Sequence, residues 1–543
     1  MPKLSKARLH EILSQRFSTG FKRLSDIPNP ALLHDGLKSA KRIASAMAKN
    51  EKIYIVGDYD VDGVTSTALM IEFFKAIGYP IEATIPNRFT DGYGVSEKII
   101  ERIEADLVIT VDNGINAFGA AQACKKRGID LIITDHHTPS ATLPDAFAIV
   151  DPKLENCEYP FKEICGAQVA WLLMGLIKKE IGSSVNLAQL MDLLCLAIVA
   201  DVMPLQDINR TLVIKGLEQM SKSQRPCMVI IRDMLSKNTL SAEDIAFQIA
   251  PRVNSAGRME DASIALDFLT AEDENLAYKQ YELLNQLNDI RKATEAEATE
   301  NAIRQVKSTD NVIVVAATGW HEGVVGIVAS RLVQRFGKPA IVLSIEKKSE
   351  TVNGISVSAE ATSDIMAKGS ARSVGNISIY DLIKTNESFL EKFGGHKMAA
   401  GLGLKETNIE AFKEAINKTA ETIPAEDYIP AEEVLGEIDS SAIDFELLNL
   451  LEQFEPYGEA NPRPRFLAAS AQVISVKRLG KEKEHAKIEL RLNAGDTQTY
   501  DLMYFRCAEE LRAGQEISCS YTLNKNVFNG RTSIQFMLDR LIV

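Results

Sequence analysis

Three short acidic stretches hold the side chains of this sequence that could perform chemistry. They lie at residues 57–63 (GDYDVDG), 111–114 (VDNG) and 134–137 (TDHH), and each follows a β-branched, apolar run. Aspartate and histidine side chains at the ends of successive strands can converge in space although they are far apart in the sequence. Such a cluster repels itself unless cations bind to it. The three stretches therefore predict a metal site, and a metal site implies chemistry.

The elements that must position these stretches alternate between strands and helices. Apolar runs predict strands at 53–57, 81–85, 107–111 and 131–134. Helices are expected between them at 65–78, 96–103 and 117–127. Continuous apolar strands that alternate with helices indicate a parallel sheet covered on both faces. Ligands of such sheets bind at the carboxyl ends of the strands, and all three acidic stretches lie at those ends.

In the first stretch, Asp58, Asp60 and Asp62 alternate along the chain. If this segment is extended, the three side chains point the same way and face one site. Gly63 then allows a tight turn with a close backbone approach. An Asp-x-Asp pair also occurs in capped turns and calcium loops, although the glutamate spacing of an EF-hand is missing here.

The second and third stretches differ in how specific they are. Asp112 precedes Asn-Gly, so a plain turn is the simpler reading of that segment. Asp135, His136 and His137 form a rarer pattern, because the chain has only seven histidines. The alternative there is an N-cap aspartate followed by two surface histidines. Mixed carboxylate and imidazole ligation suits Mn²⁺, with Mg²⁺ as a harder substitute.

A further aspartate, Asp201, closes the apolar run 196–200 (LAIVA), which reads as a helix. A carboxylate at a helix C-terminus opposes the helix dipole, and a bound cation would account for it. A water-exposed aspartate is the alternative. Together these residues offer enough ligands for two ions, which activate water and neutralise an in-line phosphoryl displacement. Hydrolysis of a phosphate ester or anhydride is therefore expected.

Basic and glycine-rich motifs form a second group of candidates. Residues 251–259 (PRVNSAGRM) place Arg252, Asn254 and Arg258 around an expected turn. Arginine also occurs in 369–373 (GSARS) and at Arg88, and a histidine occurs in the glycine-bounded loop 394–401 (GGHKMAAG). Glycine-exposed amides and arginine forks are suited to phosphate chains. Each motif alone is more typical of a plain surface loop.

The bulk properties narrow the class of protein. A chain of 543 residues is too long for one core and suggests three or four domains. The net charge of −13 argues against a protein that coats nucleic acid, but a carboxylate-rich nuclease stays possible. The seven scattered cysteines include no Cys-x-x-Cys pair, which favours reduced thiols in the cytoplasm over a zinc knuckle. No apolar stretch approaches the length of a membrane span, and the N-terminus lacks the apolar segment of a secretory signal.

The rest of the chain predicts a multidomain α/β protein. A parallel-sheet domain is followed by helices, by one long polar helix that bridges two domains, by a smaller α/β domain, and by short strands that fit a β-barrel of the OB type. The expected parts are an N-terminal helical segment (1–50), a catalytic domain (51–205), a helical extension (206–271), the connecting helix (272–307), the second α/β domain (308–422) and the barrel (430–543).

This combination of motifs resembles the DHH phosphoesterase superfamily and, within it, the RecJ family of single-strand DNA exonucleases. The resemblance covers nearly the whole chain. It rests on seven motifs, at residues 58–63, 85–88, 111–114, 134–137, 200–204, 252–258 and 394–396. The set is highly specific in its order and rough spacing, although no single element is.

The resemblance implies an enzyme, dependent on Mn²⁺ or Mg²⁺, that removes mononucleotides from the 5′ end of single-stranded DNA. It implies a DHH domain, a DHH-associated domain with a Gly-Gly-His loop, and an OB fold. It also implies roles in recombination, mismatch repair and rescue of stalled forks. The partners that it suggests are single-strand-binding protein and a RecQ-type helicase. The expected location of the protein is the cytoplasm.

By the same resemblance, the metal ligands are expected at Asp60, Asp62, Asp112, His136 and Asp201, with Asp58 and His137 as close neighbours. The related family II pyrophosphatases have a histidine four residues before the Asp-x-Asp pair, and this chain has Val56 at that position. Asp58 is therefore a candidate ligand that could replace this histidine. The expected catalytic set is Asp60, Asp62, Asp112, His136, His137 and Asp201. The expected phosphate and DNA contacts are Arg88, Arg252, Asn254, Arg258, Ser370, Arg372, Gly395 and His396.

The barrel would supply a groove for single strands. Candidate basic or polar contacts are Lys477, Arg478, Lys481, Lys483, Lys487, Lys525, Asn529 and Arg531. Tyr521 and Phe528 are candidate stacking platforms. Glutamates lie among these basic residues, so the alternative is that part of this surface is a solvated hairpin and not a DNA-binding groove.

The sequence leaves two other classes of function open. A DHH-type nanoRNase or cyclic dinucleotide phosphodiesterase would use the same metal site, but such chains are usually shorter and lack a barrel. A non-catalytic replication scaffold could share the fold. Degenerate relatives of that kind lose ligands, whereas this chain retains the acidic and histidine set.

Overall fold

A computed structural model describes residues 3–346, 365–430, 433–480, 482–492, 496–505, 507, 510–528 and 531–542, without the side chains of 527, 528 and 531. These residues form two compact units. Unit 1 comprises Met1–Ile85, Gly94–Ala250 and Glu432–Val543, and unit 2 comprises Pro86–Tyr93 and Pro251–Ala431. Each unit is described by itself below.

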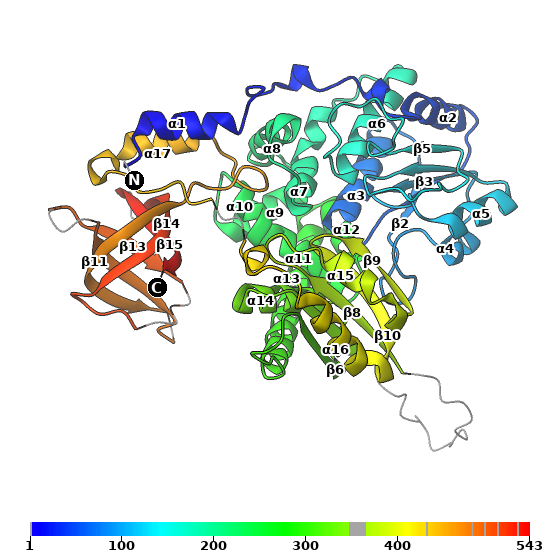
Figure 1. The fold of residues 1–543 in the computed structure, drawn as a ribbon. Helices are drawn as coiled ribbons and strands as arrows, with labels where there is room; N and C mark the ends of the chain where they lie inside the picture. Colours follow the sequence, from blue (N-terminus) through cyan, green and yellow to red (C-terminus); the bar gives the residue numbers. More distant parts are fainter. Residues whose placement is uncertain are drawn as a thin grey trace. The chain divides into compact units, whose positions relative to one another are not determined.

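Unit 1 contains the predicted parallel sheet (Figure 1). Its strand order is β2-β1-β3-β4-β5 and every pairing is parallel. The strands are β1 (Ile53–Val56), β2 (Glu82–Thr84), β3 (Leu107–Val111), β4 (Asp130–Thr134) and β5 (Ala148–Val150). All five residues of β3 are buried, as its uninterrupted apolar sequence predicts. The helices between the strands are α3 (Val61–Ala76), α4 (Glu97–Arg102) and α5 (Phe118–Arg127).

The first acidic stretch is not extended throughout, and this corrects one expectation. Helix α3 begins at Val61, four residues before the predicted start, so that Asp60 is its N-cap and Asp62 lies in its first turn. The Asp60 carboxylate accepts a hydrogen bond from the Gly63 amide at 3.1 Å. Aspartate satisfies the open amides of a first helical turn, and this local capping prevails over the strand-like alternation.

A mostly helical region follows the sheet, as expected. In unit 1 it contains α2 (Gly36–Ala48) from the preceding segment and then α6 (Gly166–Glu180), α7 (Met191–Ala200), α8 (Asp207–Met220), α9 (Pro226–Leu235) and α10 (Ala242–Asp244). Unit 2 contains α11 (Ala250–Met259) apart from its first residue, α12 (Ser263–Leu269) and α13 (Glu274–Ile303). Residues 252–258 lie inside α11, so the turn expected there is wrong. The long polar segment is one continuous helix, α13, of 30 residues. No helix among the described residues is long and apolar enough to span a bilayer.

Unit 2 has a mixed sheet in the order β6-β7-β8-β10-β9. The strands are β6 (Ile313–Thr318), β7 (Ala340–Ile345), β8 (Met366–Arg372), β9 (Lys392–His396) and β10 (Ala399–Lys405). Only β6 and β7 pair in parallel, while the other pairings are antiparallel. The motifs around Arg372 and His396, expected as loops, are therefore strands. Helices α14 (Val325–Phe336), α15 (Ile379–Thr385) and α16 (Ile409–Ala420) belong to the same unit.

The C-terminal strands close into a five-stranded barrel, as predicted. They are β11 (Phe466–Leu479), β12 (His485–Arg491), β13 (Tyr500–Tyr504), β14 (Glu516–Phe528) and β15 (Arg531–Ile542), in the order β11-β12-β13-β15-β14. Helix α17 (Phe445–Glu452) precedes them and packs against α1 (Lys6–Gln15), where Lys6 forms an ion pair with Asp444 at 2.6 Å.

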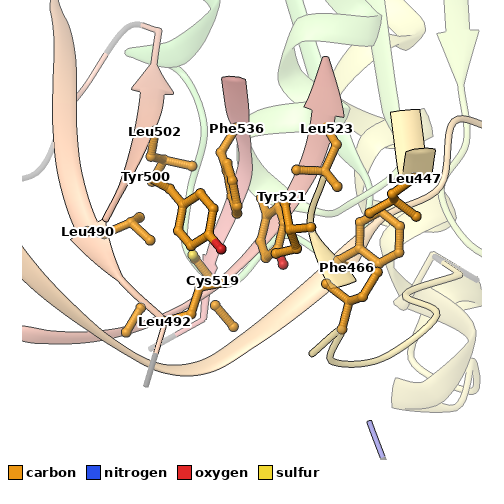
Figure 2. Packing of buried hydrophobic residues seen from close by; sticks show 14 of the residues in the cluster. Leu447, Phe466, Leu490, Leu492, Tyr500, Leu502, Cys519, Tyr521, Leu523 and Phe536 are labelled. Atoms are coloured by element: carbon orange, nitrogen blue, oxygen red, sulfur yellow. The ribbon is translucent and has the colours of Figure 1, made fainter. Parts of the chain in front are cut away.

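The expected role of Tyr521 as a stacking platform is wrong, because this ring fills the barrel core. It is 1% exposed and stacks against Phe536 with 4.5 Å between ring centroids (Figure 2). Its position on β14 turns it inward, as the alternation of a strand dictates. The other candidate platform, Phe528, and Arg531 have side chains outside the described part, as do Lys481 and Asn529 entirely.

Replacement of Tyr521 by phenylalanine is expected to leave the free energy of unfolding unchanged or to raise it by up to about 1 kcal/mol. The buried hydroxyl has no hydrogen-bond partner among the described residues, so its removal relieves a desolvation cost. Chemical denaturation of the full chain measures this effect, and the affinity for single-stranded DNA should stay at the wild-type value. A variant destabilised by more than about 1 kcal/mol would contradict this, because it would mean that the hydroxyl makes a hydrogen bond in the core.

Candidate metal centre and phosphate-binding trough

The acidic stretches of unit 1 converge on the imidazole of His136. Its Nε2 lies 3.2 Å from Asp112 Oδ1, 3.6 Å from Asp201 Oδ2 and 3.7 Å from Asp62 Oδ2. These groups come from the ends of β3 and β4, the first turn of α3 and the C-terminus of α7. The cluster therefore lies at the strand ends, as predicted, and Asp201 joins it as expected.

Three overlapping sets of side chains have the geometry to hold a cation. In each set the potential ligand atoms all lie within 4.8 Å of one another. The sets are Asp112, His136 and His137; Asp62, His136 and Asp201; and Asp58, Asp60 and Asp112. Because Asp112 and His136 are shared, the sets are continuous, and this arrangement has room for more than one ion.

The backbone at Asp112 is adapted to this geometry. Its φ is +62°, a conformation that non-glycine residues rarely adopt. The side chain of Asn113 stabilises the turn, because its Nδ2 donates to the carbonyls of Val56 and Val111 and its Oδ1 accepts from the Val95 amide. The turn that was the simpler interpretation of this segment is therefore present, and Asn113 stabilises it. Asp112 nevertheless points into the cluster.

The N-terminus of α6 anchors the other side of the cluster. The Asp62 carboxylate accepts hydrogen bonds from the amides of Gly166 and Ala167, at 2.6 and 2.9 Å. A Cβ at Gly166 would lie 2.5 Å from the Cβ of Asp112, so only glycine permits this approach. The positive end of the helix dipole therefore lies beside two of the carboxylates.

The electrostatics of the cluster are those of crowded, buried carboxylates. Burial, reinforced by the charge of Asp60, raises the pKa of Asp58 well above its usual value, and burial with Asp62 does the same for Asp112. Burial and the charges of Asp62 and Asp60 raise the pKa of Asp201 to about 9. The ionised cluster is therefore unfavourable unless a positive charge lies within it.

The side chains of the cluster suit a divalent cation, because several of their potential ligand atoms have no hydrogen-bond partner in the part of the chain that the structure describes. Among the described residues, Asp58 Oδ1, Asp112 Oδ1, Asp201 Oδ2 and His136 Nδ1 are buried without a hydrogen-bond partner. Buried polar atoms in proteins are nearly always paired. Carboxylate oxygens with one or two imidazoles form a set that Mn²⁺ and Mg²⁺ accept.

Asp135 organises the histidine pair and is not itself part of these sets. Its carboxylate accepts from the amides of His136 and Ile115 and binds His137 Nδ1 at 2.7 Å. Burial opposes the protonation of His137, but the bond to Asp135 prevails and raises the pKa of this imidazole to about 9. His137 therefore carries a proton at neutral pH, with Nδ1 engaged.

Two residues beside the cluster were not predicted from the sequence. Asp151 follows β5 and is fully buried, with Oδ2 unpaired among the described residues, and burial raises its pKa to about 7. Lys153 lies two residues further on, and its amide donates to Asp151 Oδ1 at 2.7 Å. The run 148–150 is apolar, so the same strand-end rule would have found Asp151.

Unit 2 contains a trough whose floor is made by the smallest residues. Directly opposed residues of antiparallel strands point to the same face. Register places Lys368, Ser370 and Arg372 of β8 opposite Gly403, Gly401 and Ala399 of β10, which in turn lie opposite Lys392, Gly394 and His396 of β9. The small middle row leaves space between the two outer rows. A pocket of about 330 Å³ lies at the end of the trough formed by Lys368, Ser370, Lys392 and Gly394, and Arg88 and Glu322 also line it, whereas Arg372 and His396 lie outside its lining.

The first turn of α14 closes one side of this trough. A Cβ at Gly326 would lie 3.0 Å from Arg372 Nη2 and 3.4 Å from Ser370 Oγ, so both side chains reach the helix N-terminus. Burial lowers the pKa of the Arg372 guanidinium, and its Nη1 donates to the Ala371 carbonyl at 2.8 Å. A helix N-terminus with arginine and serine side chains is suited to a phosphate group.

The remaining candidates of unit 2 are distributed around the trough. Arg258 Nη1 contacts the Gly323 carbonyl at 3.4 Å, and Arg252 Nε donates to Asn285 Oδ1 of α13 at 2.6 Å. Asn254 is half-buried on α11, and His396 is exposed at the end of β9. Gly395 has a φ of +146° and lies against the backbone of β10, where no side chain fits.

The basic residues of the barrel are partly engaged with acidic neighbours. Lys487 forms an ion pair with Asp501 at 2.8 Å, and Lys525 lies 3.5 Å from Glu452. Arg478 Nη1 donates to the Cys507 carbonyl at 3.0 Å. The alternative of a solvated hairpin thus describes part of this surface.

Comparison with known proteins follows the same division of the chain. Residues 52–198 match the DHH family N-terminal domain, residues 309–422 match the DHHA1 domain, and residues 436–540 match the RecJ OB domain. The single-stranded-DNA-specific exonuclease RecJ of Haemophilus influenzae is 31% identical to 95% of this chain, and the match covers 92% of that protein. The chain belongs to the RecJ family.

Other members of the RecJ family agree with this assignment. The single-stranded-DNA-specific exonuclease RecJ of Bacillus subtilis is 35% identical over 95% of this chain, which spans 64% of the length of that relative. A crystal structure of RecJ from Thermus thermophilus in complex with Mn²⁺ superposes with a TM-score of 0.79 at 28% identity, covering 95% of this chain and 73% of that one. A structure of the Thermus protein with Mg²⁺ matches as well.

Proposed function

We propose that this chain degrades single-stranded DNA from the 5′ end and releases mononucleotides by metal-dependent hydrolysis of phosphodiester bonds. The observation that carries the proposal is the convergence of five acidic side chains and His136 in a RecJ family member, with several ligand atoms that have no hydrogen-bond partner among the described residues. The specificity for single-stranded DNA is proposed because the relatives are named single-stranded-DNA-specific exonucleases. The 5′ polarity is proposed from the family resemblance and from the trough of unit 2, which is suited to a phosphate.

The metal-binding residues would be Asp60, Asp62, Asp112, His136 and Asp201, with Asp58 as a further ligand. Mn²⁺, with Mg²⁺ as the alternative and two ions per site, would activate the attacking water and neutralise the reacting phosphate. Within the chain, the amides of α6 fix the orientation of the Asp62 carboxylate, and the neighbouring carboxylates fix the His136 ring. This rigidity keeps the ligand atoms in place before the substrate binds.

His137 would supply the proton that the leaving 3′ oxygen needs. Its Nδ1 is held by Asp135 at 2.7 Å, so the proton would be donated from Nε2. Burial lowers the pKa of this imidazole, but the bond to Asp135 prevails and raises it to about 9, which favours the protonated form. A positioned acid of this kind typically contributes a factor of about 100 to 10,000 to the rate.

The trough of unit 2 would bind the 5′-terminal phosphate of the strand. Arg372 and Ser370 would donate hydrogen bonds to its oxygens at the N-terminus of α14, and Arg88 and Lys368 would add positive charge. Arg258 would act through the Gly323 loop, and Arg252, Asn254, Gly395 and His396 are proposed as further DNA or phosphate contacts.

The barrel favours this function over that of a nanoRNase or cyclic dinucleotide phosphodiesterase, because those substrates are too short to need an additional single-strand-binding domain. A non-catalytic scaffold is disfavoured by the complete acidic set. Roles in recombination, mismatch repair and fork rescue, and binding to single-strand-binding protein and a RecQ-type helicase, are proposed on the family resemblance.

The direct test compares one oligonucleotide labelled at either end, incubated with the full chain and Mn²⁺. The 5′-labelled strand should release labelled mononucleotide from the first time point, whereas the 3′-labelled strand should shorten progressively and release label last. Two- to five-nucleotide RNAs should be cleaved more slowly than the long DNA. Early release of mononucleotide from the 3′ label would refute the polarity, and a preference for the short RNAs would favour the alternative enzyme class.

A further inference from the structure

An aromatic pair in unit 2 has no role in the proposal so far. The rings of Phe89 and His321 meet edge to face, with 5.5 Å between their centroids and 78° between their planes. Their chain neighbours Arg88 and Glu322 both line the trough pocket. The pair therefore lies at the rim of the pocket to which the 5′ phosphate is assigned.

Polar contacts hold the Phe89 segment in place. The Phe89 amide donates to Asn87 Oδ1 at 3.0 Å, and the Asn87 amide group donates in turn to the Glu260 carbonyl and to Asp261 Oδ2, both at 3.1 Å. Despite this support the Phe89 ring is 44% exposed. A large apolar ring that is held in position and left open to solvent beside a polar pocket is a typical platform for a ligand.

The His321 loop is equally well anchored. His321 Nδ1 accepts a hydrogen bond from the Gly323 amide at 3.1 Å, so in the neutral ring Nε2 carries the proton. Burial, with a contribution from Arg88, lowers the pKa of this imidazole and favours that neutral form. A Cβ at Gly323 would lie 2.0 Å from the Arg258 carbonyl oxygen, so the loop lies directly against α11. His321 thus fixes the Phe89 ring and keeps an N–H donor available.

The charge and size of the pocket indicate the ligand. Arg88, Lys368 and Lys392 line it together with Glu322. Lys368 pairs with Glu322 at 3.2 Å, so Arg88 and Lys392 give the lining its net positive charge, which favours an anion. Its volume of about 330 Å³ is within the range of small-ligand sites. An aromatic ring beside an anion pocket matches a nucleotide, in which a flat base adjoins a phosphate.

We propose that Phe89, supported by His321, stacks on the base of the 5′-terminal nucleotide while the trough holds its phosphate. This inference rests on the proposed exonuclease function and assigns the part of the site that recognises the base. Stacking does not depend on base identity, because every base offers a π-face. The platform therefore senses whether a base is present, and not which base it is.

The test compares two 5′-phosphorylated strands that differ only in the terminal nucleotide, a thymidine or an abasic tetrahydrofuran residue. With the full chain and Mn²⁺, kcat/KM for release of the first residue should be about tenfold lower on the abasic strand, the size of one lost stacking contact. The Phe89→Ala variant should be about tenfold slower than wild type on the thymidine strand and show no further loss on the abasic strand. Phe89→Trp, which retains a ring, should preserve the wild-type ratio.

Phe118→Ala is the matched control, because Phe118 is a partly exposed phenylalanine at the start of α5 in unit 1. It should keep the wild-type ratio between the two strands. A wild-type enzyme that releases both terminal residues equally fast, or a Phe89→Ala variant that still discriminates tenfold, would overturn the stacking role and leave the exonuclease function standing. A wild-type enzyme that releases nothing from either 5′ end would refute the exonuclease function itself, and the platform with it.

Discussion

Replacement of Asp112 by asparagine is expected to slow mononucleotide release by about 1,000-fold or more, because metal-based stabilisation of the transition state is worth several kcal/mol. Asp112 is shared by two of the three potential ligand sets and lies 3.2 Å from His136 Nε2. The amide keeps the size of the side chain but loses the charge. Asparagine also tolerates the positive φ of this position, so the fold should survive. Single-turnover cleavage of a 5′-labelled strand measures the loss.

The same substitution should raise the melting temperature of the protein in EDTA. Burial and the charge of Asp62 raise the pKa of Asp112, so this carboxyl destabilises the folded state wherever the unfolded chain would ionise it, and the cost falls only as the pH drops below the raised pKa towards the usual value of an aspartate. An amide removes that cost. Asp145→Asn is the control, because Asp145 is exposed and pairs with Lys125 at the surface. Activity within tenfold of wild type for Asp112→Asn would contradict the assignment of this residue to the metal centre.

The second large effect is expected at Arg372. The Arg372→Ala variant should lose about 30- to 100-fold in kcat/KM on 5′-phosphorylated strands, since hydrogen bonds to charged groups contribute about 1.5–3 kcal/mol. Strands with a 5′ hydroxyl should be affected much less, because the partner of the guanidinium is missing in them. The ratio of kcat/KM for the two kinds of strand is the measurement that isolates this contact.

Two variants make the Arg372 experiment specific. Arg372→Lys keeps the charge but not the planar fork, and should recover only part of the preference for a 5′ phosphate. Arg335→Ala changes an arginine in the last turn of α14, at the opposite end of the helix from the trough, and should leave the preference intact. An unchanged preference in Arg372→Ala would place the 5′ phosphate elsewhere.

Local sequence signals located the candidate metal centre because its geometry follows from the topology of the sheet. Parallel strands end at one edge, so Asp112 and His136 had to be neighbours once β3 and β4 were recognised. The conformation of the first stretch was misjudged, because the strand-like alternation of Asp58, Asp60 and Asp62 and the capping signal of Asp60 are both present in the same residues. Helix capping prevailed.

The trough of unit 2 could not be derived in this way, because it depends on the register of three strands. Gly401 and Gly403 become informative only when β10 is known to lie between β8 and β9. In the sequence they read as loop glycines. The same limit applies to Phe89 and His321, which are more than 200 residues apart and meet only in the folded unit. The prediction that Tyr521 is a stacking platform was wrong for a simpler reason. Register decides which face of a strand turns inward, and the sequence of β14 alone does not show its register.

The central claim is that the acidic cluster of unit 1 binds the catalytic cations. Crystals of the wild-type chain grown with Mn²⁺ and measured at the manganese absorption edge test it most directly. The anomalous map should show peaks within coordination distance of Asp60, Asp62, Asp112, His136 and Asp201. Peaks that lie only elsewhere on the protein, or a cluster that stays free of manganese, would contradict the account.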